Sequence, residues 1–221
     1  MKEIGLINKS RLGILEDIID KSYAILLAQI HNGRITLENE SDLQLQFSYL
    51  LKVIGELHQF SFNDIFSLKL EVPYQSTLPL VKSNTNKAKI DIVLELVDRL
   101  NVSDTVKCAI ELKFFKKVNQ REPNNRYDAF ADIHNLEAYV GASFDFGVFI
   151  MGTDHSHYVT QGSYNNATAD FDLRDGKRYI SGSLLKFKTV KPHGPDIKLK
   201  NNYDFEWNPS GDKWFLKLSI V

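Results

Sequence analysis

Hydrophobic residues recur at two different spacings along this chain, and the change of spacing marks the expected elements. Near the start, apolar residues fall three or four positions apart, as they do on one face of a helix. From residue 65 onward they alternate with polar residues, as on a half-buried strand. The pattern predicts helices over residues 10–32 and from residue 39 or 41 to residue 57, then strands over residues 65–72, 88–97 and 106–115.

The second half of the chain adds one more helix and a strand expected at the centre of a sheet. Apolar residues three or four apart predict a helix over residues 125–140. Residues 146–151 are non-polar on both faces, which is typical of a strand covered on both sides. We also expect a loop at the polar residues 83–87, and a C-terminal hairpin of residues 203–207 and 214–220 around a turn at residues 208–211.

Together these elements predict an α/β fold with a mixed central sheet. With 221 residues, the chain is long enough for one well-packed core and short for two, so a single domain over residues 1–221 is expected. Its core would be residues 39–151, in the order helix, three strands, helix, strand. The N-terminal helix and a β-rich extension over residues 152–221 would be additions to that core.

Composition is that of a globular protein and excludes several other classes. Apolar residues make up 43% and charged residues 25% of the chain, and no apolar stretch is long enough to cross a bilayer. The single cysteine, Cys108, excludes an internal disulfide and fits a reducing compartment, so we expect a cytoplasmic protein. The net charge of −1 counts mildly against a nucleic-acid partner, because phosphate binding favours a basic surplus.

Three charged residues interrupt the apolar positions of the second and third predicted strands. Asp91 lies between two isoleucines, and Glu111 and Lys113 lie two apart on the next strand, so those two side chains emerge on the same side of the sheet. If the strands are neighbours, all three side chains converge. Two carboxylates suit a hard, oxygen-preferring cation such as Mg²⁺, and a lysine beside them can hold or deprotonate a water and offset developing negative charge.

The combination is what favours a site, since Glu111 and Lys113 by themselves are an ordinary pattern. Charges alternate in this way on the exposed face of many antiparallel strands. The aspartate on the preceding strand, the apolar neighbours of all three residues and the order of the elements favour a catalytic site over a solvated face.

These residues resemble the PD-(D/E)XK nuclease superfamily, which includes many restriction endonucleases. The motif of that family is an aspartate on one strand, then an acidic residue, any residue and a lysine on the next. Here it is Ile90-Asp91 followed by Glu111-Leu112-Lys113. The family core has the order helix, three strands, helix, strand, which matches about half of this chain. Ile90 occupies the position of the proline that gives the motif its first letter, and replacement of that proline is common in the family.

The resemblance implies metal-dependent hydrolysis of phosphodiester bonds in DNA. Asp91 and Glu111 would ligate Mg²⁺, for which Mn²⁺ can substitute, with the carbonyl of Leu112 assisting. Lys113 would serve the attacking water.

Many members of the family also carry a carboxylate on the first core helix. Glu40 lies one step before the apolar stripe of that helix and is the natural candidate, with Glu38 and Asp42 as competitors. Gln44, one turn later, could reach the same site, although a capping or surface role is favoured for it.

Basic residues around the predicted site are candidates for nucleic-acid contacts. Lys116 and Lys117 follow the strand that carries Lys113, and Arg126 begins the next helix, where it could contact a phosphate. A surface salt bridge from Arg126 to Glu122 or Asp128 is an equal alternative.

We therefore expect a Mg²⁺-dependent DNA endonuclease with a restriction or other defence role, which could act as a homodimer as restriction enzymes often do. The alternatives are a non-catalytic nucleic-acid-binding or interaction module with the same fold, and a repair or junction-resolving nuclease.

Overall fold

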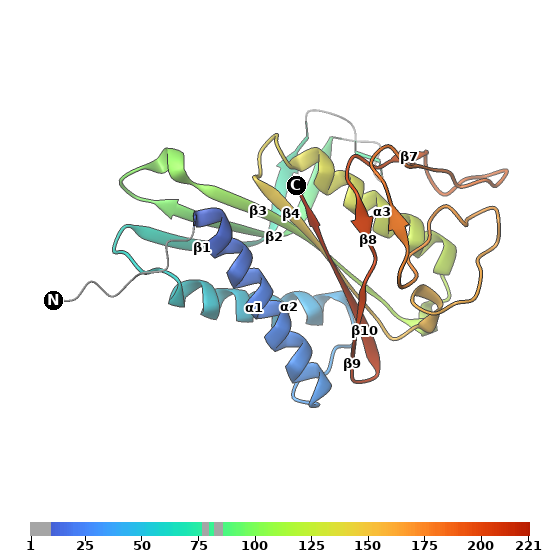
Figure 1. The fold of residues 1–221 in the computed structure, drawn as a ribbon, viewed down its shortest axis with the longest axis horizontal. Helices are drawn as coiled ribbons and strands as arrows, with labels where there is room; N and C mark the ends of the chain where they lie inside the picture. The colour runs from blue at the N-terminus through green and yellow to red at the C-terminus, as the bar shows by residue number, and fades with distance from the viewer. Residues whose placement is uncertain (1–9, 77–79, 82–85) are drawn as a thin grey trace.

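A six-stranded mixed sheet with helices on both faces forms the centre of the molecule (Figure 1). The computed structural model describes residues 10–76, 80–81 and 86–221. The chain is thus a mixed α/β protein, as the hydrophobic pattern predicts. None of the helices in the described ranges is long and apolar enough to cross a membrane.

Two long helices cover one face of the sheet. Ser10 caps α1 (Arg11–His31) and Asn39 caps α2 (Glu40–Leu57), each by accepting a hydrogen bond from a backbone N–H in the first turn. Gly33 follows α1 with a φ of +67°, the left-handed conformation that ends many helices. Both helices lie where the spacing of apolar residues predicts them.

The central sheet takes its six strands from both halves of the chain. They are β1 (Asp64–Gln75), β2 (Lys87–Asp98), β3 (Val106–Phe115), β4 (Phe146–Thr153), β9 (Trp207–Ser210) and β10 (Lys213–Ile220). Their spatial order is β1-β2-β3-β4-β10-β9, and every pair is antiparallel except β3–β4. A parallel pair needs a crossover connection, which α3 (Glu122–Tyr139) provides on the other face. The C-terminal hairpin therefore completes the central sheet.

Short elements connect and cover this framework. Two small ladders lie in the C-terminal region, and three 3-10 turns lie in the connections. They are β5 (Arg178–Tyr179) with β8 (Tyr203–Asp204), β6 (Leu184–Leu185) with β7 (Ile197–Lys198), and η1 (Val102–Asp104), η2 (Lys117–Asn119) and η3 (Ser156–Tyr158).

Several element boundaries differ from the expected ones. Pro73 does not end the first strand but lies within β1, an edge strand, where proline is tolerated. α3 begins at Glu122, three residues early, because proline fits the first turn of a helix. The C-terminal turn lies at Gly211, with φ of +64°, so residues 207–210 are strand. Of the loop expected at residues 83–87, residues 83–85 lie outside the described ranges and Lys87 belongs to β2.

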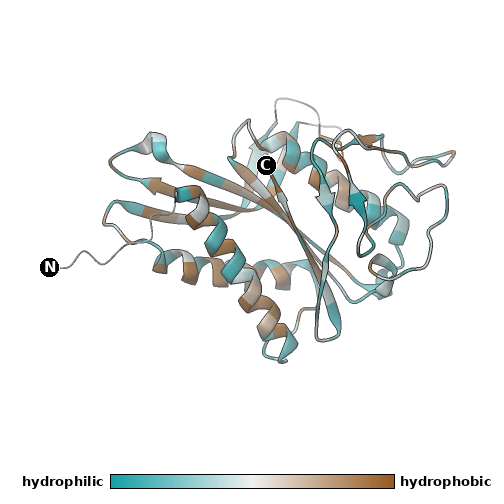
Figure 2. Cartoon of the chain, in the orientation of Figure 1, coloured by the Kyte–Doolittle hydropathy of each residue, from teal (hydrophilic) through white to brown (hydrophobic). Residues whose placement is uncertain are grey.

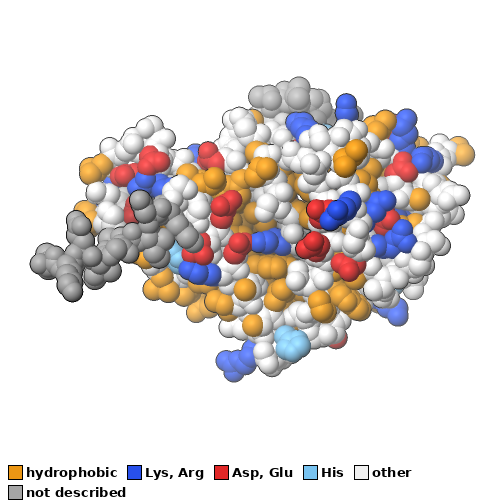
Figure 3. All heavy atoms as spheres, in the orientation of Figure 1, with side chains coloured by type: hydrophobic (Ala, Val, Ile, Leu, Met, Phe, Trp, Pro, Cys, Tyr) orange, Lys and Arg blue, Asp and Glu red, His pale blue; other side chains and the backbone are white. Residues whose placement is uncertain are grey.

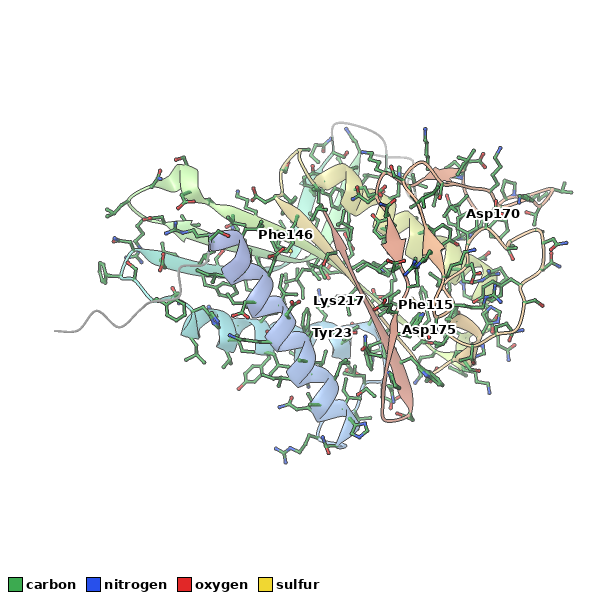
Figure 4. The ribbon with its side chains drawn as sticks, viewed as in Figure 1. Tyr23, Phe115, Phe146, Asp170, Asp175 and Lys217 are labelled. Atoms are coloured by element: carbon green, nitrogen blue, oxygen red, sulfur yellow. The ribbon has the colours of Figure 1, made fainter. Side chains whose placement is uncertain are left out.

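Apolar residues form one core on each face of the sheet. Figure 2 shows hydrophobic residues along the central strands and in stripes on the helices. One core joins α1 and α2 to the sheet, and the other joins α3 and the C-terminal region to it. Where α1 crosses β10, Lys217 pairs with Asp20 and its ammonium lies 5.7 Å from the centre of the Tyr23 ring (Figure 4).

Glu137 on α3 anchors the C-terminal region. Its Oε1 accepts hydrogen bonds from the backbone N–H groups of Lys200 at 2.8 Å and Asn201 at 2.9 Å, and from the Tyr203 hydroxyl at 2.8 Å. Burial alone would raise the pKa of Glu137, but the nearby His134 ring and the hydrogen bonds from Tyr203 and these two N–H groups lower it below its ordinary value. The ionised carboxylate is therefore the form that the fold stabilises.

We expect Glu137→Gln to lower the free energy of unfolding by about 3 kcal/mol near neutral pH, because it removes a buried, hydrogen-bonded charge. The pKa of Glu137 is lower in the folded chain than in the unfolded chain. Its contribution is therefore present above the ordinary glutamate pKa and is lost as the pH falls through the folded-state pKa.

Urea unfolding of both proteins from about pH 7 to about pH 3 measures this loss. The exposed Glu206→Gln is the control and should show a small difference at every pH. A gap between wild type and Glu137→Gln that stays constant with pH would contradict the assignment.

Candidate active site

The candidate site lies where β2 and β3 separate. The two strands are paired up to Ile92 opposite Ile110. Beyond that point β2 remains paired with β1, and β3 remains paired with β4. The sheet is therefore split next to Asp91 and Glu111.

The β1–β2 pair is irregular at the same level. Glu71 lies opposite Asp91, and although their neighbours are paired in register, these two are not. Glu71 has a φ of +51°, which is uncommon for a residue with a side chain. Ile90 joins the core under α3 whereas Ile92 joins the core under α1 and α2, so these two isoleucines do not share a face, as regular alternation would require. The alternation changes sides at Asp91.

Side chains replace backbone hydrogen bonds where the strands separate. Asp91 Oδ2 accepts from the N–H of Leu112 at 2.7 Å, and Gln44 Nε2 donates to the carbonyl of Asp91 at 3.0 Å. The carboxylate of Glu40 accepts from the N–H of Phe114. A buried backbone group without a partner costs about 1–3 kcal/mol, so these side chains stabilise the split. Gln44 thus reaches the site, and the favoured capping or surface role is wrong.

Asp91, Glu111 and Lys113 come together in one pocket. The pocket has a volume of about 230 Å³, and Asp132 and Tyr139 of α3 also line it. Glu111 is 6% exposed, so it lies at the buried end of the pocket. Convergence of the three predicted residues requires β2 and β3 to be neighbours, and they are.

Burial and mutual repulsion disfavour the ionised form of the two acids. Burial raises the pKa of Glu111 well above its usual range, and the carboxylates of Asp132 and Asp91 raise it further. Burial also raises the pKa of Asp91, although Lys113 and the N–H of Leu112 act in the opposite direction. A bound cation would relieve this repulsion.

Lys113 supplies positive charge to the acidic cluster. Its Nζ donates to the carbonyl of Leu112 at 2.7 Å, lies 3.0 Å from Asp132 Oδ2 and lies 3.6 Å from Glu40 Oε2. Burial alone would lower the pKa of Lys113, but the surrounding carboxylates raise it above its ordinary value. The side chain is therefore an ammonium ion at neutral pH, held at three points.

Of the three carboxylates near the start of α2, Glu40 is the one that approaches Lys113. Glu38 instead pairs with Lys116 Nζ at 2.7 Å, and Asp42 accepts a hydrogen bond from the N–H of Glu38 at 2.8 Å. Burial raises the pKa of Glu40, and Lys113 acts against that rise.

Three residues of α3 belong to the pocket and were missed by the sequence analysis. Asp132, Asn135 and Tyr139 line it, and the two polar ones are 6% and 7% exposed. Their spacing of three and four places them on one face of a helix, which was visible in the sequence. The predicted apolar stripe lies on the adjacent face, so the polar face was expected to be exposed, whereas α3 is buried on most sides.

The three basic residues expected to contact nucleic acid differ in their surroundings. Lys117 is exposed, and Lys116 is paired with Glu38. Arg126 was expected at the surface but is 2% exposed. Its guanidinium donates to the carbonyls of Thr168 and Phe171 and lies 3.7 Å from the Tyr164 ring centre. Both interpretations of Arg126, as a phosphate contact and as a surface salt bridge, are corrected, because its donors hold the C-terminal region to α3.

The carboxylate and carbonyl oxygens of the site are the kind of ligand that Mg²⁺ prefers. Mg²⁺ retains several of its own waters and is commonly bound through one or two carboxylates, which Asp91 and Glu111 can supply. The carbonyl of Leu112 has a second lone pair besides the one that Lys113 uses. Asp132 is turned to Lys113, and within the described ranges no three His, Cys, Asp or Glu side chains form a metal-binding group.

Comparisons with known proteins do not place the chain in a family: no family model, no curated protein and no solved structure matches it.

If Asp91 and Glu111 bind a divalent cation, Mg²⁺ should raise the melting temperature of the wild-type protein. Binding to the folded state stabilises it by mass action. We expect a rise of about 3–5 °C when the concentration is about ten times the dissociation constant. Differential scanning fluorimetry with and without Mg²⁺ or Mn²⁺ measures the shift.

Glu111→Gln and Asp91→Asn should abolish that shift. Glu95→Gln is the matched control, because Glu95 lies on β2 as Asp91 does but pairs with Lys69 outside the pocket. This variant should keep the shift. Equal shifts in all four proteins would place the cation elsewhere.

Proposed function

We propose that the chain is a Mg²⁺-dependent nuclease that hydrolyses phosphodiester bonds of DNA with Asp91, Glu111 and Lys113. One observation carries the proposal: two carboxylates and a fixed ammonium ion converge in a single pocket where the sheet splits. Hydrolysis of a phosphodiester needs positive charge at the phosphate and an oriented water, and this set can supply both.

The order of the elements supports a restriction-endonuclease-like core. α2, β1, β2, β3, α3 and β4 follow one another along the chain, with β3 and β4 parallel and α3 as their crossover. Asp91 lies on the second strand, and Glu111 and Lys113 lie on the third, as the resemblance to the PD-(D/E)XK superfamily requires. One site per chain would cut one strand, so a homodimer that cuts both strands is part of the proposal.

Asp91 and Glu111 have the role of holding the cation at the scissile phosphate. Once bound, a divalent cation neutralises charge on the phosphate and lowers the pKa of water. The hydrogen bond from Leu112 N–H fixes the Asp91 carboxylate, and burial fixes Glu111, so neither acid has to reorganise during the reaction.

Lys113 acts in this proposal as a cation and not as a base. Its ammonium is surrounded by carboxylates, which favour the protonated form. It can therefore orient the attacking water and offset negative charge on the phosphate oxygens. Asp132 and Glu40 hold Lys113 from opposite sides, one from α3 and one from α2, and are positioning residues.

The principal rival function is a module that binds nucleic acid without cutting it. The intact set of Asp91, Glu111 and Lys113 favours catalysis over that rival. A repair or junction-resolving nuclease would use the same chemistry and differ in the shape of its DNA substrate.

We expect the wild-type protein to cut plasmid DNA in the presence of Mg²⁺ and Glu111→Gln to reduce the rate by at least about 10²–10³-fold. Agarose electrophoresis over time measures nicking and linearisation. Glu95→Gln, on the neighbouring strand and outside the pocket, should cut like the wild type. Equal cutting by Glu111→Gln would place catalysis elsewhere, and no cutting of plasmid, single-stranded DNA or RNA by the wild type would favour the binding module.

A second substitution tests how Lys113 is positioned. Asp132→Asn should lower kcat about ten- to a hundredfold with little change in KM, because it releases the ammonium that acts in the transition state. In a Lys113→Ala background, the same substitution should have a much smaller effect, since its partner is absent.

Steady-state cleavage of a short labelled duplex provides both constants. Asp128→Asn is the control, because Asp128 lies one helical turn away and pairs with His193. Additive losses from Asp132→Asn and Lys113→Ala would show that Asp132 does not act through Lys113.

A further inference from the structure

Two lysines form one side of the entrance to the catalytic pocket. Lys87 and Lys89 line the pocket together with Asp91, and the three alternate along β2. Both lysines are exposed, in contrast to the buried carboxylates beside them. We call Lys87 and Lys89 the β2 rim.

The region around the start of α2 is acidic. Glu38, Glu40 and Asp42 lie around the start of α2, and Lys116, expected to bind nucleic acid, is paired with Glu38 there. The face drawn in Figure 3 carries acidic and basic side chains intermixed. A polyanion approaching the pocket is therefore repelled near the start of α2 and attracted at the β2 rim.

We propose that Lys87 and Lys89 bind backbone phosphates of the nucleic-acid strand next to the scissile bond, an inference that rests on the proposed nuclease function. Alternate residues of a strand are about 6.6 Å apart, so the two ammonium groups can neutralise two different phosphates. The strand would run from Asp91 outward along β2. Such contacts set the position of a nucleic acid and carry no sequence information.

Glu71 weakens the rim in the unliganded protein. Its Oε2 lies 3.7 Å from Lys89 Nζ, and the two side chains are 51% and 67% exposed. An exposed pair of this kind contributes little to stability, so a phosphate can displace the carboxylate. Removal of the Glu71 charge should then strengthen binding, which is an effect that damage to the fold would not produce.

The experiment measures binding separately from cleavage. In a Glu111→Gln background, fluorescence anisotropy with two labelled duplexes of unrelated sequence gives the dissociation constant over a series of salt concentrations. Loss of each rim lysine should reduce the slope of log affinity against log salt by about 0.9, to the same extent for both sequences. Glu71→Gln should tighten binding about two- to fivefold.

Two double variants serve as controls. Lys21 and Lys52 are half-exposed lysines on α1 and α2 that pair with Asp17 and Glu56, so Lys21→Ala/Lys52→Ala removes the same charge away from the pocket. It should leave the slope unchanged. Lys116→Ala/Lys117→Ala tests the path expected from the sequence and should also leave the slope unchanged.

The outcomes separate this inference from the function on which it rests. If the Glu111→Gln parent binds DNA and the Lys87→Ala/Lys89→Ala variant keeps its affinity and slope, the proposed phosphate contacts of the β2 rim are wrong and the nuclease proposal stands. If the Lys116→Ala/Lys117→Ala variant has the reduced slope instead, the nucleic acid passes over Lys116 and Lys117 and not over the β2 rim. If the parent binds neither duplex at low salt and the wild type cuts no nucleic acid, both proposals are overturned.

Discussion

The hydrogen bond from the N–H of Leu112 to the carboxylate of Asp91 is the interaction on which the site depends. At this point β2 and β3 separate, and a side chain takes the place of a partner strand. Gln44 and Glu40 satisfy two further backbone groups from α2. Because buried backbone groups need partners, the polar residues of the site are also structural residues of the sheet. The left-handed backbone of Glu71 lies at the same level of the sheet. Strained backbone conformations of this kind are commonly found at functional sites.

The buried charges around Lys113 are costly for folding, so stability alone does not explain them. Four carboxylates influence one buried ammonium ion, and the acids of β2 and β3 have raised pKa values. A buried ion pair seldom stabilises a fold more than apolar residues of the same volume would. The cluster is thus better explained by binding of a cation and a phosphate than by stability, which is why we favour catalysis.

α3 connects this site to the rest of the chain. One of its faces supplies Asp132, Asn135 and Tyr139 to the pocket. Arg126 and Glu137 on the same helix hold the C-terminal region through hydrogen bonds to backbone carbonyls and N–H groups. A helix buried on most sides must pair its polar residues, and each of these has a separate set of partners. The C-terminal region is therefore positioned by the same helix that completes the site.

Local features of this protein could be predicted from the sequence. The start of α2 near residue 39, the alternation in β3, and the placement of Asp91 and Glu111 on neighbouring strands depend on residues close together in the chain. Backbone geometry links such residues directly, so periodicity is enough to find them.

What the sequence by itself determined was the α/β class, the order of the elements and three candidate residues on two strands. The tertiary structure alone decided that Glu40 and not Glu38 approaches Lys113, that Asp132 joins them, and that Arg126 is buried. It also decided that Lys87 and Lys89 of β2 line the pocket. These facts depend on where strands separate and on which helix covers which face. Such contacts join residues far apart in the chain, and no local spacing encodes them.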